Sequence, residues 1–456
     1  MIGAILFIVS FALFSGPNRF ISIVLLFALL TGGFQLVPLN YMVISSIGVT
    51  KCYDWVLLFV GAMLLLQPQV FLNTLVWKSF KMMSIYGVIL IILLVYSIFV
   101  QNVEPAVSVR VFRNLLYFLP IVLFVQLPQE EIAKVFKILI FITAFVSLVY
   151  CLQQVFHKTL LNGITSDFMG VSGEKDRYYN LPVYVYPVIF FLFFKDNFLQ
   201  IRFRYILLLM CCSAVLLSQH RNLLLAIVVC YFLHFLFSNR VSIIAILGFS
   251  ILSAGFLYFA DSLWNNRFSK GLEDISQTSF AITPAAFYEI DLTNITTTEF
   301  RQYLFQERLN YILKENGKTL LGAGLITDDS RKAASLNFNI GMDDGYGNVS
   351  QVASSDIAWS SMILQMGVAG TLVFILFHIS FLKDFFKERE DGIMQVGALY
   401  IIALFITSFF SNTISLPYTT SLLVLFGAYY YQLYLNKRAK SYLNDQDFNH
   451  YFSLSV

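Results

Sequence analysis

A short polar stretch between two long apolar runs carries an arginine and a histidine, and it is the first place where this chain could do chemistry. It reads Ser218-Gln219-His220-Arg221-Asn222. Ionisable groups beside apolar helices are costly and are therefore candidates for function. The planar fork of an arginine suits a phosphate, because it donates two parallel hydrogen bonds and stays charged. The alternative is that Arg221 is a helix-end arginine that reaches out to lipid headgroups.

A single aspartate opens a later apolar run, in the stretch SSDIAWSSMILQMGVAGT that begins at Ser354. An aspartate at a helix start is commonly only an N-cap. The functional alternative is that Asp356 is a general base at a membrane surface. Gly367 and Gly370 in the same run allow a neighbouring helix to approach closely.

Two glycines, Gly322 and Gly324, punctuate the segment TLLGAGL. Glycine permits a tight turn or the close approach of a backbone to a ligand. The segment is not a nucleotide phosphate loop, because no Gly-Lys-Ser/Thr follows. An ordinary turn is the alternative to a ligand-binding role.

A pair of arginines in the segment Arg110-Val-Phe-Arg113 has the spacing that puts both guanidinium groups on one helix face. Such a pair can bind anionic headgroups and do nothing more. The functional alternative is that both arginines help to bind an anionic substrate.

Metal and cofactor chemistry is not indicated by the sequence. The five histidines include none within 261–355, and the five cysteines form no CxxC pair. No HExxH, Walker or GxSxG pattern occurs. The net charge of +3 is too small for a nucleic-acid partner, which requires a dense basic face. We expect no cofactor, no metal and no nucleic acid.

The elements that must position these residues are membrane helices. Hydrophobic residues make up 58% of the 456 residues and charged residues only 12%, about half the charge of an ordinary soluble domain. A water-facing surface cannot be built from this composition. The sequence therefore predicts an all-α integral membrane protein with about 12–13 transmembrane helices.

Apolar runs of the length that crosses a bilayer define the expected spans. About ten lie in residues 1–260 and about three in 356–434. The expected spans are 2–15, 20–37, 54–71, 84–100, 114–127, 136–155, 183–195, 205–218, 222–238, 241–260, 356–382, 393–410 and 418–434.

The distribution of Lys and Arg predicts the orientation. With the tail 435–456 placed in the cytoplasm, the cytoplasmic loops and tail hold 15 basic residues and the short outer loops hold 7. The long segment 261–355 then forms one large extracytoplasmic loop. This loop carries 8 basic and 12 acidic side chains.

An amphipathic helix is expected in this loop over roughly 297–316. Thr296–Thr298 supplies an N-cap, and Gly317 is a natural C-terminal stop. Arg301 and Arg308 are seven residues apart and so share a face of this helix. We expect both to contribute to a binding site.

The order of these features resembles the O-antigen polymerase/O-antigen ligase superfamily of bacterial membrane glycan enzymes. The resemblance covers about 205–382 and consists of LLSQHRNLLLAIVV, then ERLNYILKENGKTLLGAGL in the long loop, then DIAWSSMILQMGVAGT. The ligases carry a motif written H-[NSQ]-x9-G-x-x-G-T. Gly367, Gly370 and Thr371 match its second half, whereas Asp356 and Ile357 stand where the ligases have His and Asn, Ser or Gln.

The resemblance implies a GT-C-like, metal-independent glycosyltransferase in the bacterial inner membrane. Its substrate would be a polyprenyl-diphosphate-linked oligosaccharide, with membrane lipids and a chain-length regulator as further candidate partners. Arg221 and Asp356 would be catalytic. The remaining candidate residues would bind substrate, namely His220, Arg301, Arg308, Arg110, Arg113, Gly322 and Gly324.

Three functions remain open at this point. A repeat-unit polymerase is the first hypothesis. A ligase is the second, and the absent histidine at position 356 counts against it. A secondary transporter or lipid-glycan flippase is the third, for which internal repeats and midplane charges would be more typical.

Overall fold

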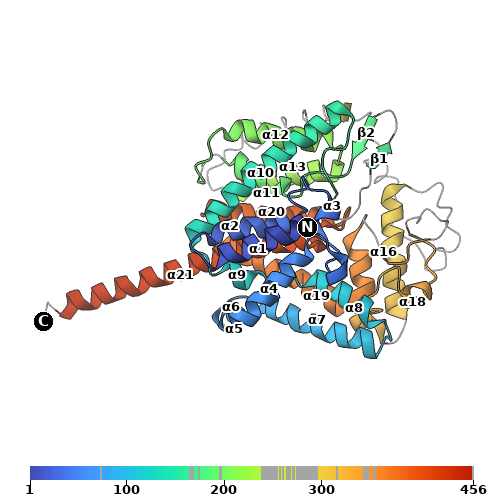
Figure 1. The fold of residues 1–456 in the computed structure, drawn as a ribbon, viewed down its shortest axis with the longest axis horizontal. Helices are drawn as coiled ribbons and strands as arrows, with labels where there is room; N and C mark the ends of the chain where they lie inside the picture. The colour runs from blue at the N-terminus through green and yellow to red at the C-terminus, as the bar shows by residue number, and fades with distance from the viewer. Residues whose placement is uncertain are drawn as a thin grey trace.

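In the computed structural model the described residues form a helical bundle with a helical cap at one end (Figure 1). The structure describes residues 1–71, 74–163, 169–172, 175–194, 198–237, 296–314, 317–341, 349–352 and 356–453, with a few isolated residues between 255 and 273. The expected span 241–260 and most of the first half of the long loop therefore lie outside the described residues.

The elements before the long loop are α1 (Ile2–Phe14), α2 (Arg19–Leu30), α3 (Leu39–Met42), η1 (Ser45–Ile47), α4 (Asp54–Leu66), α5 (Pro68–Phe71), α6 (Thr74–Ser79), α7 (Lys81–Phe99), α8 (Pro105–Leu115), α9 (Ile121–Phe124), α10 (Gln129–Phe156), β1 (Met169–Ser172), β2 (Lys175–Tyr178), α11 (Val185–Phe193), α12 (Arg204–Leu217) and α13 (Arg221–Phe237). The elements of the loop and the C-terminal part are α16 (Thr297–Lys314), α17 (Lys318–Leu321), α18 (Arg331–Ala334), α19 (Ala358–Lys387), α20 (Gly392–Ser408), η3 (Thr413–Ser415) and α21 (Pro417–Ser453).

The expected helical class agrees with the described residues, apart from one short antiparallel hairpin formed by β1 and β2. Three helices, α7, α10 and α19, are long and apolar enough to cross a membrane. Six shorter apolar helices accompany them: α1, α2, α4, α12, α13 and α20.

The expected span 114–127 is wrong. Helix α8 ends at Leu115, turns follow, and α9 forms only over Ile121–Phe124. Pro120 explains the interruption, since proline lacks the amide hydrogen that a continuing helix needs. All four α9 residues are fully buried, so this apolar run fills the bundle interior. An apolar run alone does not distinguish a buried core segment from a span.

Aromatic rings form much of the packing between helices. Phe136 of α10 lies against Phe426 of α21 with ring centroids 4.6 Å apart, and Tyr86 of α7 stacks on Phe377 of α19 at 5.3 Å. Such pairs stabilise contacts beyond the area that they bury. Many phenylalanines in the described part of the chain thus lie in the bundle core, and others are exposed on its outer surface.

Helix α7 illustrates how the bundle meets lipid. Its buried residues include Tyr86 and Leu90, whereas Val88, Ile91 and Val95 are exposed. Exposed aliphatic side chains along a 19-residue apolar helix are suited to a hydrocarbon environment. The same pattern, with one side in the core and one side apolar and exposed, recurs on α10 and α19.

The two ends of the bundle differ in what they carry. At one end Lys437 of α21 forms an ion pair with Glu388, and Asn436 donates to Gln129 of α10 at 2.9 Å. From this end α21 projects away from the body (Figure 1). At the opposite end lie the cap elements α16 and α18 (Figure 1). This second end contains most of the candidate site residues.

Candidate functional site

Helix α16 forms where the sequence predicts it, because its ends are defined by local hydrogen bonds. The Thr296 hydroxyl accepts from the Glu299 amide at 3.2 Å, and the Glu299 carboxylate accepts from the Thr296 amide at 2.9 Å. This reciprocal pair is a capping box. Gly317 follows the helix with a φ of 94°, a conformation that glycine adopts without strain.

Arg301 and Asp356 come together although 54 residues separate them in the chain. The Arg301 Nη2 lies 3.7 Å from the Asp356 Oδ1, which joins α16 to the segment that opens α19. The Arg301 guanidinium also lies over the Phe410 ring, 5.6 Å from its centroid. Its side chain is 16% exposed, and its Nε has no hydrogen-bond partner among the described residues. Burial lowers the pKa of Arg301, and Asp356 opposes that effect.

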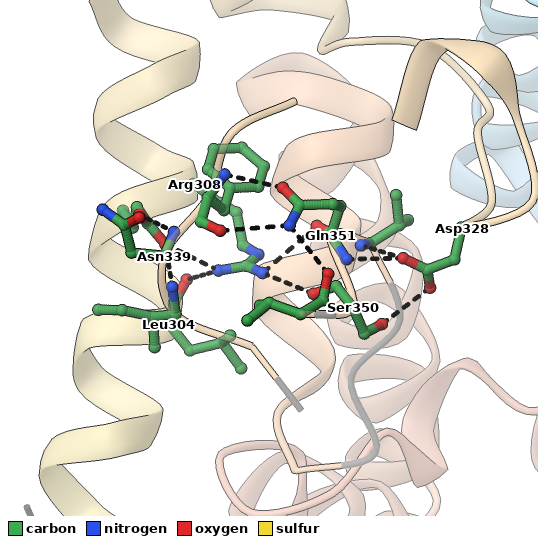
Figure 2. A network of polar contacts seen from close by, with 11 residues as sticks. Leu304, Arg308, Asp328, Asn339, Ser350 and Gln351 are labelled. Carbon is green, nitrogen blue, oxygen red and sulfur yellow. Dashed lines mark hydrogen bonds and ion pairs between the residues drawn. The ribbon is translucent and has the colours of Figure 1, made fainter. Parts of the chain in front are cut away.

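Arg308 lies in a different environment, and the expectation that it faces substrate alongside Arg301 is not supported by its contacts. Its Nη1 donates to the Leu304 carbonyl at 3.2 Å, and its Nη2 donates to the Ser350 and Gln351 carbonyls at 3.4 and 3.3 Å (Figure 2). The guanidinium lies 4.7 Å from the centroid of the Phe338 ring. Only 1% of the side chain is exposed.

Two carboxylates complete the cluster around Arg308. Glu307 lies 3.4 Å from the Arg308 Nη1 and accepts from the backbone amides of Asn339 and Ile340. Asp328 accepts from the Gln351 amide at 2.7 Å (Figure 2). Burial raises the pKa of Glu307 and lowers the pKa of Arg308 to about 10. This cluster holds the cap loops on α16, so the contacts of Arg308 are those of a structural residue.

Gly322 and Gly367 lie backbone against backbone, which joins two motifs that the sequence presents far apart. Gly322 has φ 74° and ψ −165°, and Gly367 has φ 63° and ψ −168°. Only glycine occupies this region readily. A Cβ on Gly322 would lie 2.6 Å from the Gly367 nitrogen and 2.6 Å from the Leu364 oxygen. Gly322 thus serves the close approach of α17 to α19, and its contacts are with protein backbone.

Gly324 serves the neighbouring contact with α7. Its φ is 98°, and a Cβ there would lie 3.2 Å from the Ser97 Oγ. The Ser97 hydroxyl accepts from the Leu325 amide at 2.8 Å. The Gly-x-Gly turn therefore attaches the cap to two membrane helices, α19 and α7.

Helix α19 is broken at Gly367, and the part before the break folds back. A straight helix would separate residues 359 and 378 by about 28 Å along its axis. Both rings nevertheless contact Phe405, with centroid distances of 6.3 Å from Trp359 and 5.9 Å from His378. The break thus turns the first nine residues of α19 toward α20 and brings Asp356 to the cap.

Arg221 begins α13, and the packing of α13 on α20 indicates where it lies. The His234 ring is 2.8 Å from the Gln395 amide nitrogen, and the Cys230 thiol donates to the Leu399 carbonyl at 3.5 Å. The two helices are antiparallel, because the step from His234 back to Cys230 on α13 corresponds to the step from Gln395 forward to Leu399 on α20. Continued to the start of α13, this register sets Arg221 level with Ser408, close to the Phe410 that Arg301 covers.

His220 precedes Arg221 in the tight turn between α12 and α13. Its ring lies against Tyr179 in an edge-to-face arrangement with centroids 6.0 Å apart. Gln219 before it has a φ of 55°, and Ser218 is fully buried. The turn is therefore held tightly at the cap end of the bundle.

Arg110 and Arg113 of α8 each pair with a carboxylate. Arg110 lies 2.6 Å from Asp329 of the cap, with about half of its side chain exposed. Arg113 lies 3.2 Å from the buried Asp54 at the start of α4. Both arginines therefore connect α8 to neighbouring elements, and neither is among the residues around Asp356.

Sequence reasoning missed three residues, one that contacts Arg301 and two that follow Asp356 in the chain. Phe410 lies beneath the guanidinium, while Trp359 and Ser360 are on the first turn of α19. The Trp359 Nε1 and the Ser360 Oγ are buried and have no hydrogen-bond partner in the described part of the chain. The sequence signal was present in Asp356-Ile-Ala-Trp359-Ser360, where two hydrogen-bonding side chains begin the helix just after the aspartate.

The chemistry of this arrangement is that of an anion site beside a base. Among the described residues, no three His, Cys, Asp or Glu side chains gather as metal ligands. The guanidinium of Arg301 can pair with a phosphoryl group, and the carboxylate of Asp356 can accept a proton.

Comparison with known proteins gives this chain no family: no family model matches it, and no curated protein matches it.

Proposed function

We propose that the protein is a glycosyltransferase that polymerises lipid-linked oligosaccharide repeat units at the outer face of a bacterial cytoplasmic membrane. The observation that carries the proposal is the Arg301–Asp356 pair, formed between a cap helix and a membrane helix at one end of an apolar bundle. A donor built on polyprenyl diphosphate is too lipidic to leave the bilayer. A site between membrane helices and a polar cap can hold the polyprenyl chain of this donor among the helices and its diphosphate-linked sugar under the cap.

In this reaction the acceptor hydroxyl attacks the anomeric carbon of the donor sugar. The bond from that carbon to the diphosphate breaks, and the diphosphate leaves on its polyprenyl chain. Asp356 takes the proton of the acceptor hydroxyl. Arg301 stabilises the negative charge that develops on the diphosphate, and Arg221 approaches the same region from α13. The mechanism calls for no metal.

The remaining candidates have supporting roles in this proposal. Gly322 and Gly324 position the cap on α19 and α7. His220 orients the turn before Arg221. Arg110 and Arg113 line the same end and are available to anionic headgroups when their ion pairs open. The GT-C-like architecture and the extracytoplasmic position of the cap belong to this proposal, as does a chain-length regulator as a partner.

A polymerase is favoured over a ligase because Asp356 stands where the ligases have a histidine. Deletion of the gene in its host separates the two by gel analysis of surface glycan. A polymerase deletion leaves a core that bears one repeat unit. A ligase deletion leaves bare core, with lipid-linked polymer accumulating. Long polymer at wild-type amounts in the deletion strain contradicts both assignments.

A lipid-glycan flippase or secondary transporter is the second candidate, because α19 is discontinuous at Gly367. Discontinuous helices commonly frame the substrate sites of transporters. In the same deletion strain a flippase defect leaves single lipid-linked repeats on the inner face of the membrane. Repeats that instead reach the outer face unpolymerised exclude the flippase.

A further inference from the structure

Three buried hydrogen-bond donors on α16 and the first turn of α19 have no partner among the described residues. They are the Arg301 Nε, the Trp359 Nε1 and the Ser360 Oγ. Ser360 has no exposed surface and Trp359 is 8% exposed. A buried donor without a partner costs free energy, because it has given up its hydrogen bonds to water. Such groups in a membrane interior or a cap core call for an explanation.

The residues that carry these donors are linked through Asp356 and through the adjacent rings of Phe409 and Phe410. Trp359 and Ser360 follow Asp356 by three and four residues, and Asp356 lies 3.7 Å from Arg301. The Trp359 ring packs on Phe409 with centroids 6.2 Å apart, and Arg301 covers the adjacent Phe410. By contrast, the neighbouring Ser361 hydroxyl donates to the Ala358 carbonyl at 3.1 Å.

We infer that Trp359 and Ser360 are ligand-contacting residues that donate hydrogen bonds to phosphoryl oxygens of the group that Arg301 binds. An indole N–H donates only, and a serine hydroxyl can donate to any oxygen. A guanidinium together with two neutral donors suits an oxygen-rich anion such as a diphosphate. The Asp356 carboxylate repels that anion, so the ligand replaces Asp356 as the partner of Arg301.

The inference rests on the proposed function and adds residues to it. At 3.7 Å the Arg301–Asp356 contact is long for a charge-assisted hydrogen bond, so its exchange for a phosphoryl group loses little. Exchange also removes the positive charge of Arg301 from Asp356, which makes the carboxylate a stronger proton acceptor. Because Ser360 is fully buried, binding includes a small movement of the first turn of α19 away from α16.

The test uses the purified full-length protein in detergent and two variants that each remove one donor with little change in shape, Trp359→Phe and Ser360→Ala. Thermal unfolding is recorded without ligand and across titrations of farnesyl diphosphate or inorganic diphosphate. Ser361→Ala is the matched control, because its hydroxyl already has a partner. Arg301→Lys reports on the proposed function itself.

We expect each donor variant to unfold at the same or a higher temperature than wild type, because an unsatisfied donor has been removed. We also expect each to bind farnesyl diphosphate about fivefold more weakly, the loss typical of one hydrogen bond. If inorganic diphosphate binds as tightly as farnesyl diphosphate, the site recognises the diphosphate group alone. Tighter farnesyl diphosphate binding assigns it to a lipid-linked diphosphate.

Variants that unfold at lower temperature and keep wild-type affinity overturn the inference, since they mark the two residues as structural. If Arg301→Lys then still loses affinity, the proposed function survives that result. If neither diphosphate binds wild-type protein, the proposed function and the inference both fail.

Discussion

Arg301 and Arg308 lie seven residues apart on α16 and make different contacts. Arg308 donates to three carbonyl groups, lies beside Glu307 and covers an aromatic ring, and it is almost fully buried. Arg301 has a single ion pair of 3.7 Å. The Nε of both arginines lacks a hydrogen-bond partner among the described residues, so the two differ at their terminal nitrogens. Sequence spacing predicts a shared role for the two. Their contacts separate a residue that holds the cap from one that retains capacity for a ligand.

The difference follows from what each side chain meets. Arg308 faces the returning cap segment around Gln351, which offers backbone carbonyls at the correct distance. Arg301 faces the start of α19 and the end of α20, where Asp356 and Phe410 are its contacts. A buried charge is tolerated only when it is well paired. The terminal nitrogens of Arg301 have fewer partners than those of Arg308, and this difference is the feature that points to a ligand.

The largest effect is expected from Arg308→Ala. It removes a buried guanidinium and leaves Glu307 and the cap carbonyls without that partner, so the free energy of unfolding should fall by about 3–5 kcal/mol. Reversible unfolding in detergent measures the loss. Arg331→Ala is the control, because its side chain is 95% exposed and its ion pair with Glu104 should contribute under about 1 kcal/mol. Equal losses in the two variants would remove the basis of the comparison.

Gly322→Ala should rank next. The new Cβ would lie 2.6 Å from backbone atoms of α19, in a conformation that only glycine adopts readily. We expect a loss of about 3 kcal/mol in stability and a disturbed cap around both arginines. Gly61→Ala is the matched control, because a Cβ there meets nothing within 4 Å. Protease cleavage in the cap reports the local effect, and a Gly322→Ala protein as resistant as wild type would contradict it.

Arg301→Lys should leave stability nearly unchanged and lower transfer activity by on the order of a hundredfold. Lysine keeps the charge but cannot reproduce the planar fork that stabilises a leaving diphosphate. Turnover of lipid-linked repeat units by reconstituted protein measures the effect. Arg331→Lys at the cap surface should behave as wild type. Activity retained in Arg301→Lys would mean that this arginine is as structural as Arg308.

The smallest effect concerns Asp329, which pairs with Arg110 at the cap surface. The Thr327 hydroxyl and Arg110 lower the pKa of Asp329 below its ordinary value of 3.8. A lowered carboxylate pKa stabilises the folded state at pH values above the ordinary pKa. This contribution is lost as the pH falls through the folded-state pKa. Asp329→Asn should therefore lower stability slightly at pH 7, and the difference from wild type should shrink as the pH falls through the folded-state pKa. Side-chain exposure of 57% keeps the effect below about 1 kcal/mol.

Local sequence features predicted part of this structure well. The N-cap predicted at Thr296–Thr298 and the stop predicted at Gly317 agree closely with the observed α16, Thr297–Lys314. The apolar runs gave α7 and α10. These features depend on neighbours in the chain, so they can be read from the sequence.

The parts of the fold and of the site that the sequence did not predict depend on contacts between residues far apart in the chain. The break at Gly367 depends on Gly322, which is 45 residues away, and without it Asp356 would not lie beside Arg301. The run at 114–127 has the composition of a span, and only its burial against other helices shows that it is core. The separation of Arg301 from Arg308 likewise depends on the segment that returns around Gln351.

The role of Asp356 is tested most directly by the length of the glycan made by cells that carry Asp356→Asn in place of the wild-type gene. The variant has nearly the shape of the original and keeps a partner for Arg301, but it cannot accept a proton. With the protein present in the membrane at wild-type amounts, we predict glycan stopped at a single repeat unit. A wild-type distribution of chain lengths would contradict the assignment of Asp356 as the base and the site built around it.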